Sequence, residues 1–297
     1  MAKAFSLNDY LVAIGRSSDG DSSMPALVSG QFHDVVVGKD VVYRFPRDDQ
    51  SRRQLPARVA LLEGLGHCEL PVMIPAPLST TALHQPLGQC HVALRRVPGQ
   101  PIGSEQIADS RAESAVIRDL AALLDRLSEL GTDHCVQAAV PRSDRRRWHQ
   151  FADGVSAVLF PLMSDQGRRR AEAELNRVLG VDPTGSALVH GDLGGTNLFW
   201  STDEAAAPRL TGVLDWDEAE IGNQADDLAS VAATFGWPLA RRLDAHRHAG
   251  DIPTMAAAEA IAATFALQQA LPAALSGDAP SLADGIAGYT RDDDPAG

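Results

Sequence analysis

Three oxygen-bearing side chains in the second half of the chain have the types and spacing that phosphoryl transfer requires. Asp192 lies two residues after His190, Asn197 follows five residues after Asp192, and Asp215 comes eighteen residues after Asn197. Phosphoryl transfer needs little covalent help from a protein, because catalysis consists mainly of orienting a hydroxyl and neutralising metal-bound phosphates. We therefore expect Asp192 to accept the proton of an attacking hydroxyl. We expect Asn197 and Asp215 to hold Mg²⁺ through hard oxygen ligands.

The order of these residues follows the pattern H-x-D-x-x-x-x-N of the protein-kinase catalytic loop, in which a later Asp binds the metal. Apolar runs at 186–189 and 210–214 predict strands that would bring the side chains to one site. The alternative is an ordinary loop in which His190 and Asp192 bond to the backbone and Asp215 merely ends a strand. The tripeptide HGD alone is common, but the complete ordered set favours phosphoryl transfer.

The composition limits the partners of the chain. Its 297 residues carry a formal charge of −13, which argues against a nucleic acid because such a partner needs a basic face. The same charge favours a cationic ligand. Arginine clusters within 142–147 and at 168–170 are interpreted as solvated helix faces. No apolar run approaches the roughly 20 residues of a membrane span, and no signal peptide is evident, so we expect a cytoplasmic protein with no membrane contact and no obligate protein partner.

The first third of the chain favours strands. β-branched runs at 35–37 and 41–43 are joined by Gly-Lys-Asp, which is typical of a hairpin, and leucines in 50–65 predict a helix. Four residues before the hairpin form a loop that would cover the phosphates of a nucleotide: Gly30, Gln31, Phe32 and His33. Because no G-x-G-x-x-G is present, this loop is a weak signal, and a plain turn is the alternative.

The rest of the chain favours helices, after a break that is typical of a hinge. Segment 91–97 predicts a strand and is followed by Pro-Gly-Gln-Pro at 98–101. Helices are predicted at 104–130 with Gly131 as terminator, 145–163, 166–179 with Gly180 as a stop, 224–235 and 254–275. We therefore expect two lobes, with 1–97 holding the nucleotide and 98–297 carrying the catalytic loop, the metal site and the acceptor site.

Both motifs resemble those of the aminoglycoside-phosphotransferase-like kinases, whose signature is HGDLxxxN followed by a strand and DW. Here these are HGDLGGTN at 190–197 and DW at 215–216. The resemblance spans roughly 26 to 290 and implies an α+β, bilobal, protein-kinase-like fold, with a small antiparallel-sheet lobe and a mainly helical lobe. It also implies ATP with Mg²⁺, with GTP as an alternative, and a small acceptor that carries a hydroxyl.

The same resemblance implies further roles. Asp227 falls on a structural aspartate of the family, and His190 supports the catalytic loop. Backbone groups near Arg95 and Val97 would bind the purine at the hinge. Asp227 and its neighbour Asp226 also open a predicted helix, where carboxylates favour the positive end of the dipole, so capping is a second role open to them.

Five further segments are similar to the viomycin and capreomycin phosphotransferases, a group within this family that modifies tuberactinomycin cyclic peptides. They are HGDLGG at 190–195, DWDE at 215–218, FPLMSD at 160–165, TFALQQAL at 264–271 and LADG at 282–285. The resemblance implies transfer of the γ-phosphate of ATP to a seryl hydroxyl, with capreomycin as the preferred acceptor. These antibiotics are cationic, and Asp217, Glu218 and Glu220 would form an acidic rim that attracts them; a solvated loop is the alternative for the two glutamates.

The predicted small lobe departs from the usual kinase pattern. Arg44 stands where a strand Lys ordinarily grips the phosphates, and Arg58 stands where the helix Glu partner of that Lys is expected. Glu63 lies on another part of the same predicted helix. Either Arg44 and Arg58 both serve the triphosphate or the small lobe anchors the nucleotide differently. Near the second motif, Gly-Asn-Gln at 222–224 replaces the family's G-D-P, and Asn223 can still cap the following helix.

Two other functions remain open at this point. The first is a metabolic kinase for an amino alcohol, a sugar or an aminoglycoside, because the fold does not dictate the acceptor. The second is a nucleotide-binding pseudokinase, suggested by Arg58 at the Glu position. The presence of all three of Asp192, Asn197 and Asp215 argues against an inactive protein.

Overall fold

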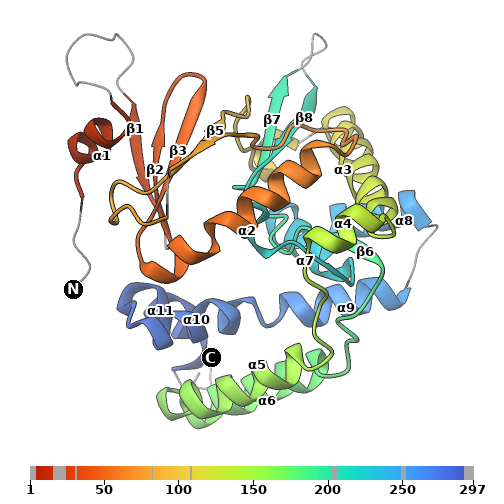
Figure 1. Ribbon diagram of the computed structural model, residues 1–297. Helices are drawn as coiled ribbons and strands as arrows, with labels where there is room; N and C mark the ends of the chain where they lie inside the picture. The colour runs from red at the N-terminus through yellow and green to blue at the C-terminus, as the bar shows by residue number, and fades with distance from the viewer. Residues whose placement is uncertain are drawn as a thin grey trace. The chain divides into compact units, whose positions relative to one another are not determined.

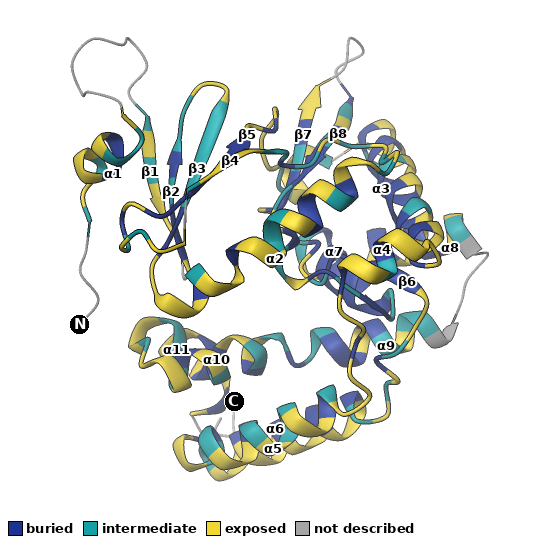
Figure 2. Ribbon diagram, viewed as in Figure 1, coloured by how far each residue is buried: buried dark blue, intermediate teal, exposed yellow. Residues whose placement is uncertain are grey.

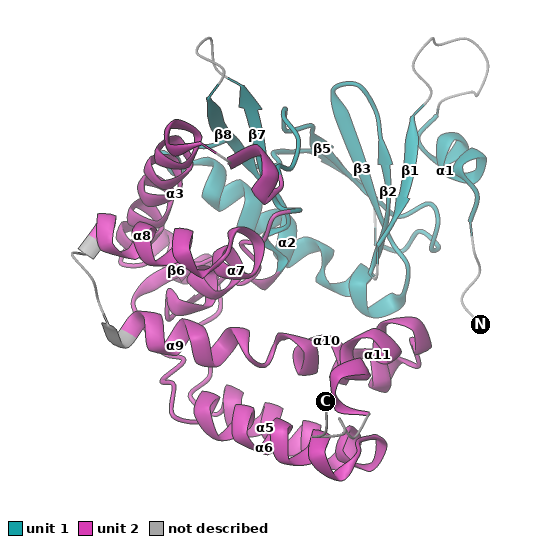
Figure 3. Cartoon of the chain, turned by 180° about the vertical axis from the view of Figure 1, so that it is seen from behind, with its two compact units in different colours: residues 1–102, 196–217 teal, residues 103–195, 218–297 magenta. Residues whose placement is uncertain are grey.

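A computed structural model describes residues 5–15, 25–30, 32–81, 83–107, 109–202, 207–248 and 252–290. The chain forms two units, and each is built from two stretches of sequence (Figure 3). Unit 1 comprises residues 1–102 and 196–217, and unit 2 comprises residues 103–195 and 218–297. The expected division, with the nucleotide bound by residues 1–97 and the acceptor by residues 98–297, stays a prediction.

Unit 1 contains a five-stranded antiparallel sheet with the order β1-β2-β3-β5-β4 (Figure 1). Its strands are β1 Ala26–Ser29, β2 His33–Val37, β3 Val41–Pro46, β4 Pro77–Thr80 and β5 Val92–Arg95. The predicted hairpin is confirmed, since Val37 pairs with Val42 and the N–H of Gly38 donates to the carbonyl of Val41. The strand predicted at 91–97 is shorter than expected: its ladder covers Val92–Arg95, and the next N–H, that of Arg96, donates to the carbonyl of Asp40 in the turn between β2 and β3.

Two helices belong to this unit. Helix α1, Leu7–Ala13, begins with a capping box formed by Ser6 and Asp9. Its buried residues Tyr10 and Leu11 pack with sheet residues, and the Tyr10 ring lies 4.3 Å from that of Phe45. Helix α2, Asp49–Gly66, begins at the N-cap Asp48 and buries one face that includes Leu55, Leu61, Leu62 and Leu65. The helix predicted over 50–65 is thus confirmed.

A second hairpin completes unit 1 and had been predicted only in part. Strands β7, Leu198–Thr202, and β8, Pro208–Val213, pair directly, and short bridges join Met73 to Gly212 and Gln100 to Trp200. The sequence predicted the second strand but not the first. Gly99 has φ +107°, and a Cβ there would lie 2.7 Å from the carbonyl oxygen of Trp200, so this close approach requires glycine.

Unit 2 is mainly helical. Its helices are α3 Ser110–Leu130, α4 His134–Ala139, α5 Arg147–Val158, α6 Asp165–Val178, α7 Ala225–Phe235, α8 Trp237–His248, α9 Ile252–Ala262, α10 Phe265–Ser276 and α11 Ala279–Ile286. Figure 2 shows α7 as the most continuously buried of these, in keeping with its Leu-, Ala- and Val-rich sequence. No helix of the described residues is long and apolar enough to cross a membrane.

Three predicted helices differ from the structure. The helix expected at 145–163 is shorter, because α5 ends at Val158 and a 3₁₀ turn, Phe160–Leu162, follows. The single helix expected at 254–275 is wrong, because α9 ends at Ala262 and α10 begins at Phe265. Thr264 lies at the break, where its hydroxyl donates to the carbonyl of Ile261 at 2.7 Å and so competes with helix continuation. The helix expected at 104–130 begins as a 3₁₀ turn, Ser104–Ile107, and continues as α3 after the N-cap Asp109.

Strand β6, Ala187–Val189, precedes the loop that carries His190 and Asp192; it pairs with β9, Glu220–Gly222, and lies against α3. Gly131 ends α3, as predicted, but with an ordinary helical φ of −61°. Its lack of a side chain serves packing instead, because a Cβ would lie 2.0 Å from the carbonyl oxygen of Ser186. The end of α3 therefore contacts the backbone that leads into β6.

Replacing Gly131 with Ala should force this contact apart. We expect the free energy of unfolding in urea to fall by about 1–3 kcal/mol, the usual cost of overpacking. Gly180→Ala is the matched control, since its Cβ would meet only the carbonyl oxygen of Arg177 at 3.4 Å. Equal effects of the two substitutions would show that the approach of α3 to β6 is not tight.

Candidate active site

The loop after β6 places His190 and Asp192 in different surroundings. His190 is fully buried, and its Nδ1 accepts the backbone N–H of Asp192 at 3.2 Å. Because Nδ1 acts as an acceptor, the neutral ring carries its proton on Nε2. Asp192 itself is exposed. The buried imidazole thus holds the backbone of the exposed residue Asp192; the supporting role of His190 in catalysis stays a prediction.

Asp227, in the first turn of α7, holds the same loop by hydrogen bonds to its backbone. Its two carboxylate oxygens accept the backbone N–H groups of His190 at 3.1 Å and of Gly191 at 3.0 Å. Gly191 has φ +85°, and a Cβ there would lie 2.7 Å from the carbonyl oxygen of Glu218. Complete burial raises the pKa of Asp227 to about 7, although the two N–H donors act in the opposite direction. Asp227 therefore braces the loop and does not cap its own helix.

Helix α7 also holds the far end of the loop. The N–H of Gly195 donates to the hydroxyl of Thr234 at 2.8 Å, seven residues beyond Asp227 on the same helix. No sequence signal pointed to Thr234, since a lone threonine late in a helix has no motif. The N-terminal end of α7 is capped locally, because Asn223 Oδ1 accepts the N–H of Ala225 at 3.0 Å, as predicted for Asn223.

Asn197 and Asp215 lie together at one end of the β7–β8 hairpin. Leu198 pairs with Val213, and the N–H of Leu214 donates to the carbonyl of Asn197 at 2.9 Å. Asp215 is the non-glycine residue with a positive φ, +58°, among the described part of the chain. This left-handed conformation, which Asp tolerates better than most residues, turns the chain directly after the strand.

The two side chains have the chemistry of a Mg²⁺ site. Both offer hard oxygen ligands, and the pairing of the hairpin keeps them at the same end. Among the described residues, no group of three or more His, Cys, Asp or Glu side chains could hold a metal ion without help. Mg²⁺ is commonly bound by one or two protein oxygens together with waters and substrate phosphates, so an Asn–Asp pair fits it.

The catalytic sequence is divided between the two units. Asp192 belongs to unit 2, whereas Asn197 and Asp215 belong to unit 1. The structure therefore joins the two predicted metal ligands within one unit and supplies Asp192 with its own support in the other. The predicted roles of all three stay predictions.

The predicted nucleotide loop is the turn between β1 and β2. The N–H of Gly30 donates to the carbonyl of His33 at 2.8 Å, and Arg47 donates to the carbonyl of Gly30 at 2.6 Å. Phe32 is half exposed, whereas His33 is buried. Gln31 lies outside the described residues. The turn is thus a short, backbone-bonded connection of the kind that could cover a phosphate group.

The residues expected at the hinge have different environments. The backbone N–H of Arg95 donates to the carbonyl of Ala76 at 2.8 Å, so that donor is already used in unit 1. Val97 is buried, and a Cβ on Gly212 would lie 2.0 Å from its Cγ1. A backbone contact from Val97 to a purine stays a prediction.

Arg44 extends from β3 to two aspartates of unit 1. Its Nη2 lies 3.3 Å from Asp215 Oδ1 and 2.8 Å from Asp217 Oδ2, and it also contacts His33 Nδ1 at 3.3 Å. Burial first, and then the Arg44 guanidinium, lower the pKa of His33 to about 4. His33 is therefore neutral near pH 7 and can accept from Arg44.

The acidic rim is arranged differently from the expectation. Arg44 and Arg58 contact the carboxylate of Asp217 within unit 1, and the predicted contact of Asp217 with the acceptor stays a prediction. Glu218 is exposed and stays a candidate for acceptor contact. Glu220 lies 3.1 Å from Arg147, and burial raises its pKa while Arg147 lowers it.

Arg147 is a correction to the interpretation of its cluster as a solvated face. Its guanidinium makes two 3.1 Å bonds to Asp226, one to each carboxylate oxygen, and also contacts Glu220 and lies over the ring of Trp148. Asp226 is nearly fully buried, so a paired cation is needed to stabilise its charge. No motif pointed to this pairing, because Arg147 and Asp226 lie 79 positions apart.

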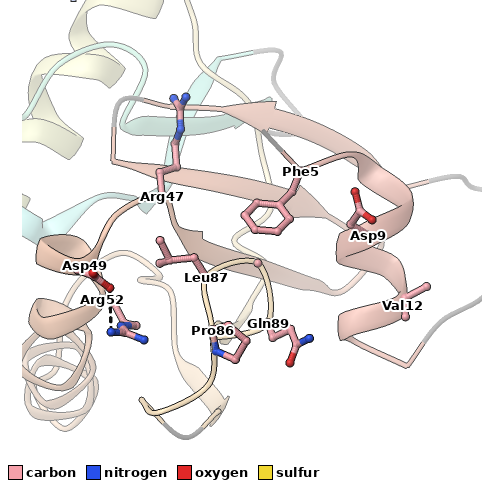
Figure 4. Close-up of a pocket in the computed structure, with 10 residues that line it drawn as sticks. Phe5, Asp9, Val12, Arg47, Asp49, Arg52, Pro86, Leu87 and Gln89 are labelled. Atoms are coloured by element: carbon pink, nitrogen blue, oxygen red, sulfur yellow. Dashed lines mark ion pairs between the residues drawn. The ribbon is translucent and has the colours of Figure 1, made fainter. Parts of the chain in front are cut away.

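A cavity of about 670 Å³ in unit 1 contains none of the predicted site residues among those that line it. The residues that line it include the apolar side chains of Phe5, Pro86 and Leu87 and the arginines Arg47 and Arg52 (Figure 4). Arg52 is already paired with Asp49 at 2.8 Å. The described contacts give this cavity no part in phosphoryl transfer.

Comparison with known proteins gives consistent results. The sequence profile described as the phosphotransferase enzyme family matches residues 28–261. Viomycin phosphotransferase of Streptomyces vinaceus is 41% identical over 264 residues, which cover 89% of this chain and 92% of that protein.

Solved structures agree on the fold. An aminoglycoside phosphotransferase solved with GDP and kanamycin superposes with a TM-score of 0.79 at 21% identity, covering 93% of this chain and 94% of that one. A ternary complex of a related enzyme with streptomycin and ATP gives a TM-score of 0.69 at 19% identity, covering 90% of each chain. The expected α+β kinase-like fold, with an antiparallel sheet followed by a helical region, is confirmed.

Asp227 predicts a pH dependence of stability. Because its folded-state pKa is raised from 3.8 to about 7, its contribution to the free energy of unfolding is fully present below about pH 3.8 and is lost as the pH rises through about 7. Chemical unfolding of the parent and of Asp227→Asn should therefore show an advantage for the parent that shrinks between pH 4 and pH 8.

Thr234→Val is the matched control. It removes the other bond from α7 to the loop, the one to Gly195 N–H, without removing a titratable group. Its cost should stay constant across the same pH range. A parent advantage over Asp227→Asn that is flat or grows with pH would contradict the raised pKa.

Proposed function

Because the chain belongs to the phosphotransferase enzyme family, we propose that it transfers the γ-phosphate of ATP to a seryl hydroxyl of a tuberactinomycin cyclic peptide. Capreomycin is the first acceptor to test and viomycin the second. The observation that carries this proposal is the 41% identity to viomycin phosphotransferase over 89% of the chain. The excess of acidic residues, with a formal charge of −13, favours such cationic acceptors.

The residues of the site have separable tasks in this proposal. Asp192, exposed and fixed through its backbone by His190, accepts the proton of the attacking hydroxyl. Asn197 and Asp215 would hold Mg²⁺, which when bound neutralises charge on the phosphates. Asp227 keeps the loop in place through two backbone N–H groups.

A second acceptor class deserves a direct test. Glu218 is exposed and follows Asp215 by three residues in the sequence, and an exposed carboxylate would also suit an aminoglycoside, which is likewise cationic. The fold does not decide between the two classes. An acceptor panel does, and the same panel addresses a pseudokinase, which would phosphorylate none of its members.

The panel tests the proposed function and the role of Asp192 together. The parent, Asp192→Ala and Asp165→Ala would be incubated with ATP or GTP, Mg²⁺ and capreomycin, viomycin or an aminoglycoside. Mass spectrometry should show one added phosphate on capreomycin or viomycin with the parent. Loss of the general base should lower kcat for Asp192→Ala by about 10²–10⁴-fold.

Asp165→Ala, which removes an exposed carboxylate at the start of α6, should retain the parental rate. Phosphorylation of an aminoglycoside alone would move the acceptor assignment to the second class. An Asp192→Ala variant as fast as the parent would remove Asp192 from the chemistry.

Asp215→Ala should fail in a different way. Because only Asn197 would remain as a protein ligand, the Mg²⁺ concentration that gives half-maximal activity should rise by about tenfold or more. The measurement is a Mg²⁺ titration of activity at saturating acceptor. An unchanged Mg²⁺ dependence would show that Asp215 does not bind the metal.

A further inference from the structure

Three charged side chains from separate segments of unit 1 meet at one carboxylate oxygen. Asp217 Oδ2 lies 2.8 Å from Arg44 Nη2 and 2.6 Å from Arg58 Nη1. All three side chains are largely buried, with exposed fractions of 19% for Arg44, 18% for Arg58 and 15% for Asp217. Two guanidinium groups at this separation would repel each other without the carboxylate, so Asp217 is required for both to occupy these positions.

The position of Arg58 on α2 explains why it points inward. Leu55 and Leu62, three residues before and four residues after it, lie on the buried face of the helix. Arg58 therefore lies on that face and not on the solvated one. Glu63, the acidic residue that could have replaced the usual helix Glu, is exposed. The helix thus offers a cation where the common kinase plan has a carboxylate.

One nitrogen of the Arg44 guanidinium makes three contacts, and the other two nitrogens keep their N–H donors. His33 Nδ1, Asp215 Oδ1 and Asp217 Oδ2 all contact its Nη2. A guanidinium has five N–H donors, and the contacts of Arg44 with described residues leave those of Nε and Nη1 for another partner. Since Asp215 is the proposed metal ligand, these donors lie beside the place where the phosphates of a nucleotide would bind Mg²⁺.

We propose that Arg44 and Arg58 together form a phosphate clamp for the nucleotide, and that Asp217 is the positioning residue that holds them. This inference rests on the proposed function. It reassigns Asp217 from the acceptor rim to the nucleotide side and makes Arg58 a phosphate ligand in place of a helix Glu. The planar guanidinium of Arg44, with the donors that its protein contacts leave over, suits the β-phosphate of a nucleoside triphosphate, which AMP lacks.

The test measures nucleotide binding without turnover. Isothermal titration calorimetry would give the Kd of MgATP, MgADP and AMP for the parent and four variants. These are Arg58→Met, Asp217→Asn, Asp217→Glu and the double variant that combines Arg58→Met with Asp217→Asn. We expect Arg58→Met and Asp217→Asn each to weaken MgATP binding by about tenfold and to leave AMP binding nearly unchanged. Asp217→Glu should restore most of the affinity, and the double variant should lose less than the product of the single losses, because the pair acts as one unit.

Two exposed residues of α2 supply the controls: Arg53→Met removes an outward arginine, and Glu63→Gln removes an outward carboxylate. Both should bind MgATP as the parent does. The thermal midpoint of every variant is recorded in the same buffer. For Arg58→Met and Asp217→Asn, steady-state kinetics should show a raised KM for ATP and an unchanged KM for the acceptor.

Several results would overturn the clamp. Tighter MgATP binding by Asp217→Asn would mean that the carboxylate only repels phosphates. A raised acceptor KM with parental nucleotide Kd would return Asp217 to the acceptor rim. A lowered thermal midpoint with parental Kd would make the cluster purely structural. If the parent binds no nucleotide, the proposed function itself fails. If the parent binds MgATP and Arg58→Met and Asp217→Asn bind it equally well, the clamp alone is wrong.

Discussion

The arrangement of the catalytic loop depends on one buried carboxylate. Asp227 is fully buried, and a buried charge is tolerated only when its oxygens are hydrogen-bonded. The backbone N–H groups of His190 and Gly191 satisfy both oxygens, which ties the loop to α7 at 3.0–3.1 Å. Gly191 must be a glycine for this loop to approach Glu218, and its positive φ turns the chain so that the next residue, Asp192, reaches solvent. The exposure of Asp192, the proposed base, thus follows from the buried hydrogen bonds of Asp227.

Arginines have a related task elsewhere in an acidic chain. Arg147 joins Asp226 and Glu220 in unit 2, whereas Arg44 and Arg58 join Asp217 in unit 1. Such largely buried pairs contribute little net stability, because desolvation offsets most of the Coulomb attraction, but breaking one partner is costly. Their value is positional. Each cluster fixes the direction of a charged group whose flexible side chain would otherwise sample many rotamers, which is what a site for phosphates or a cationic acceptor requires.

Local signals in the sequence predicted the local structure. The β2–β3 hairpin, α2, α3 and the order His190, Asp192, Asn197, Asp215 follow from β-branched runs, leucine spacing and a short motif. Features that depend on distant residues were missed: the pairing of Arg147 with Asp226, the hold of Thr234 on Gly195, and the two arginines on Asp217. A cluster of charged residues in a sequence does not show which distant residues will pair with it. The break at Thr264 was missed for a different reason. The helical periodicity continues across it, and the hydrogen bond from the Thr264 hydroxyl to the Ile261 carbonyl leaves no mark on that pattern.

The division of the motif between units gives its spacing a mechanical meaning. Asp192 is braced by α7 of unit 2, and Asn197 begins the hairpin that ends at Asp215 in unit 1. Only four residues separate Asp192 from Asn197, so the covalent chain alone limits how far the proposed base can lie from the first proposed metal ligand. The two ends of this short connection are fixed by independent contacts, Gly195 to Thr234 on one side and Asn197 to Leu214 on the other. Five residues span at most about 18 Å, so the connection sets an upper limit on the distance between the Cα atoms of Asp192 and Asn197.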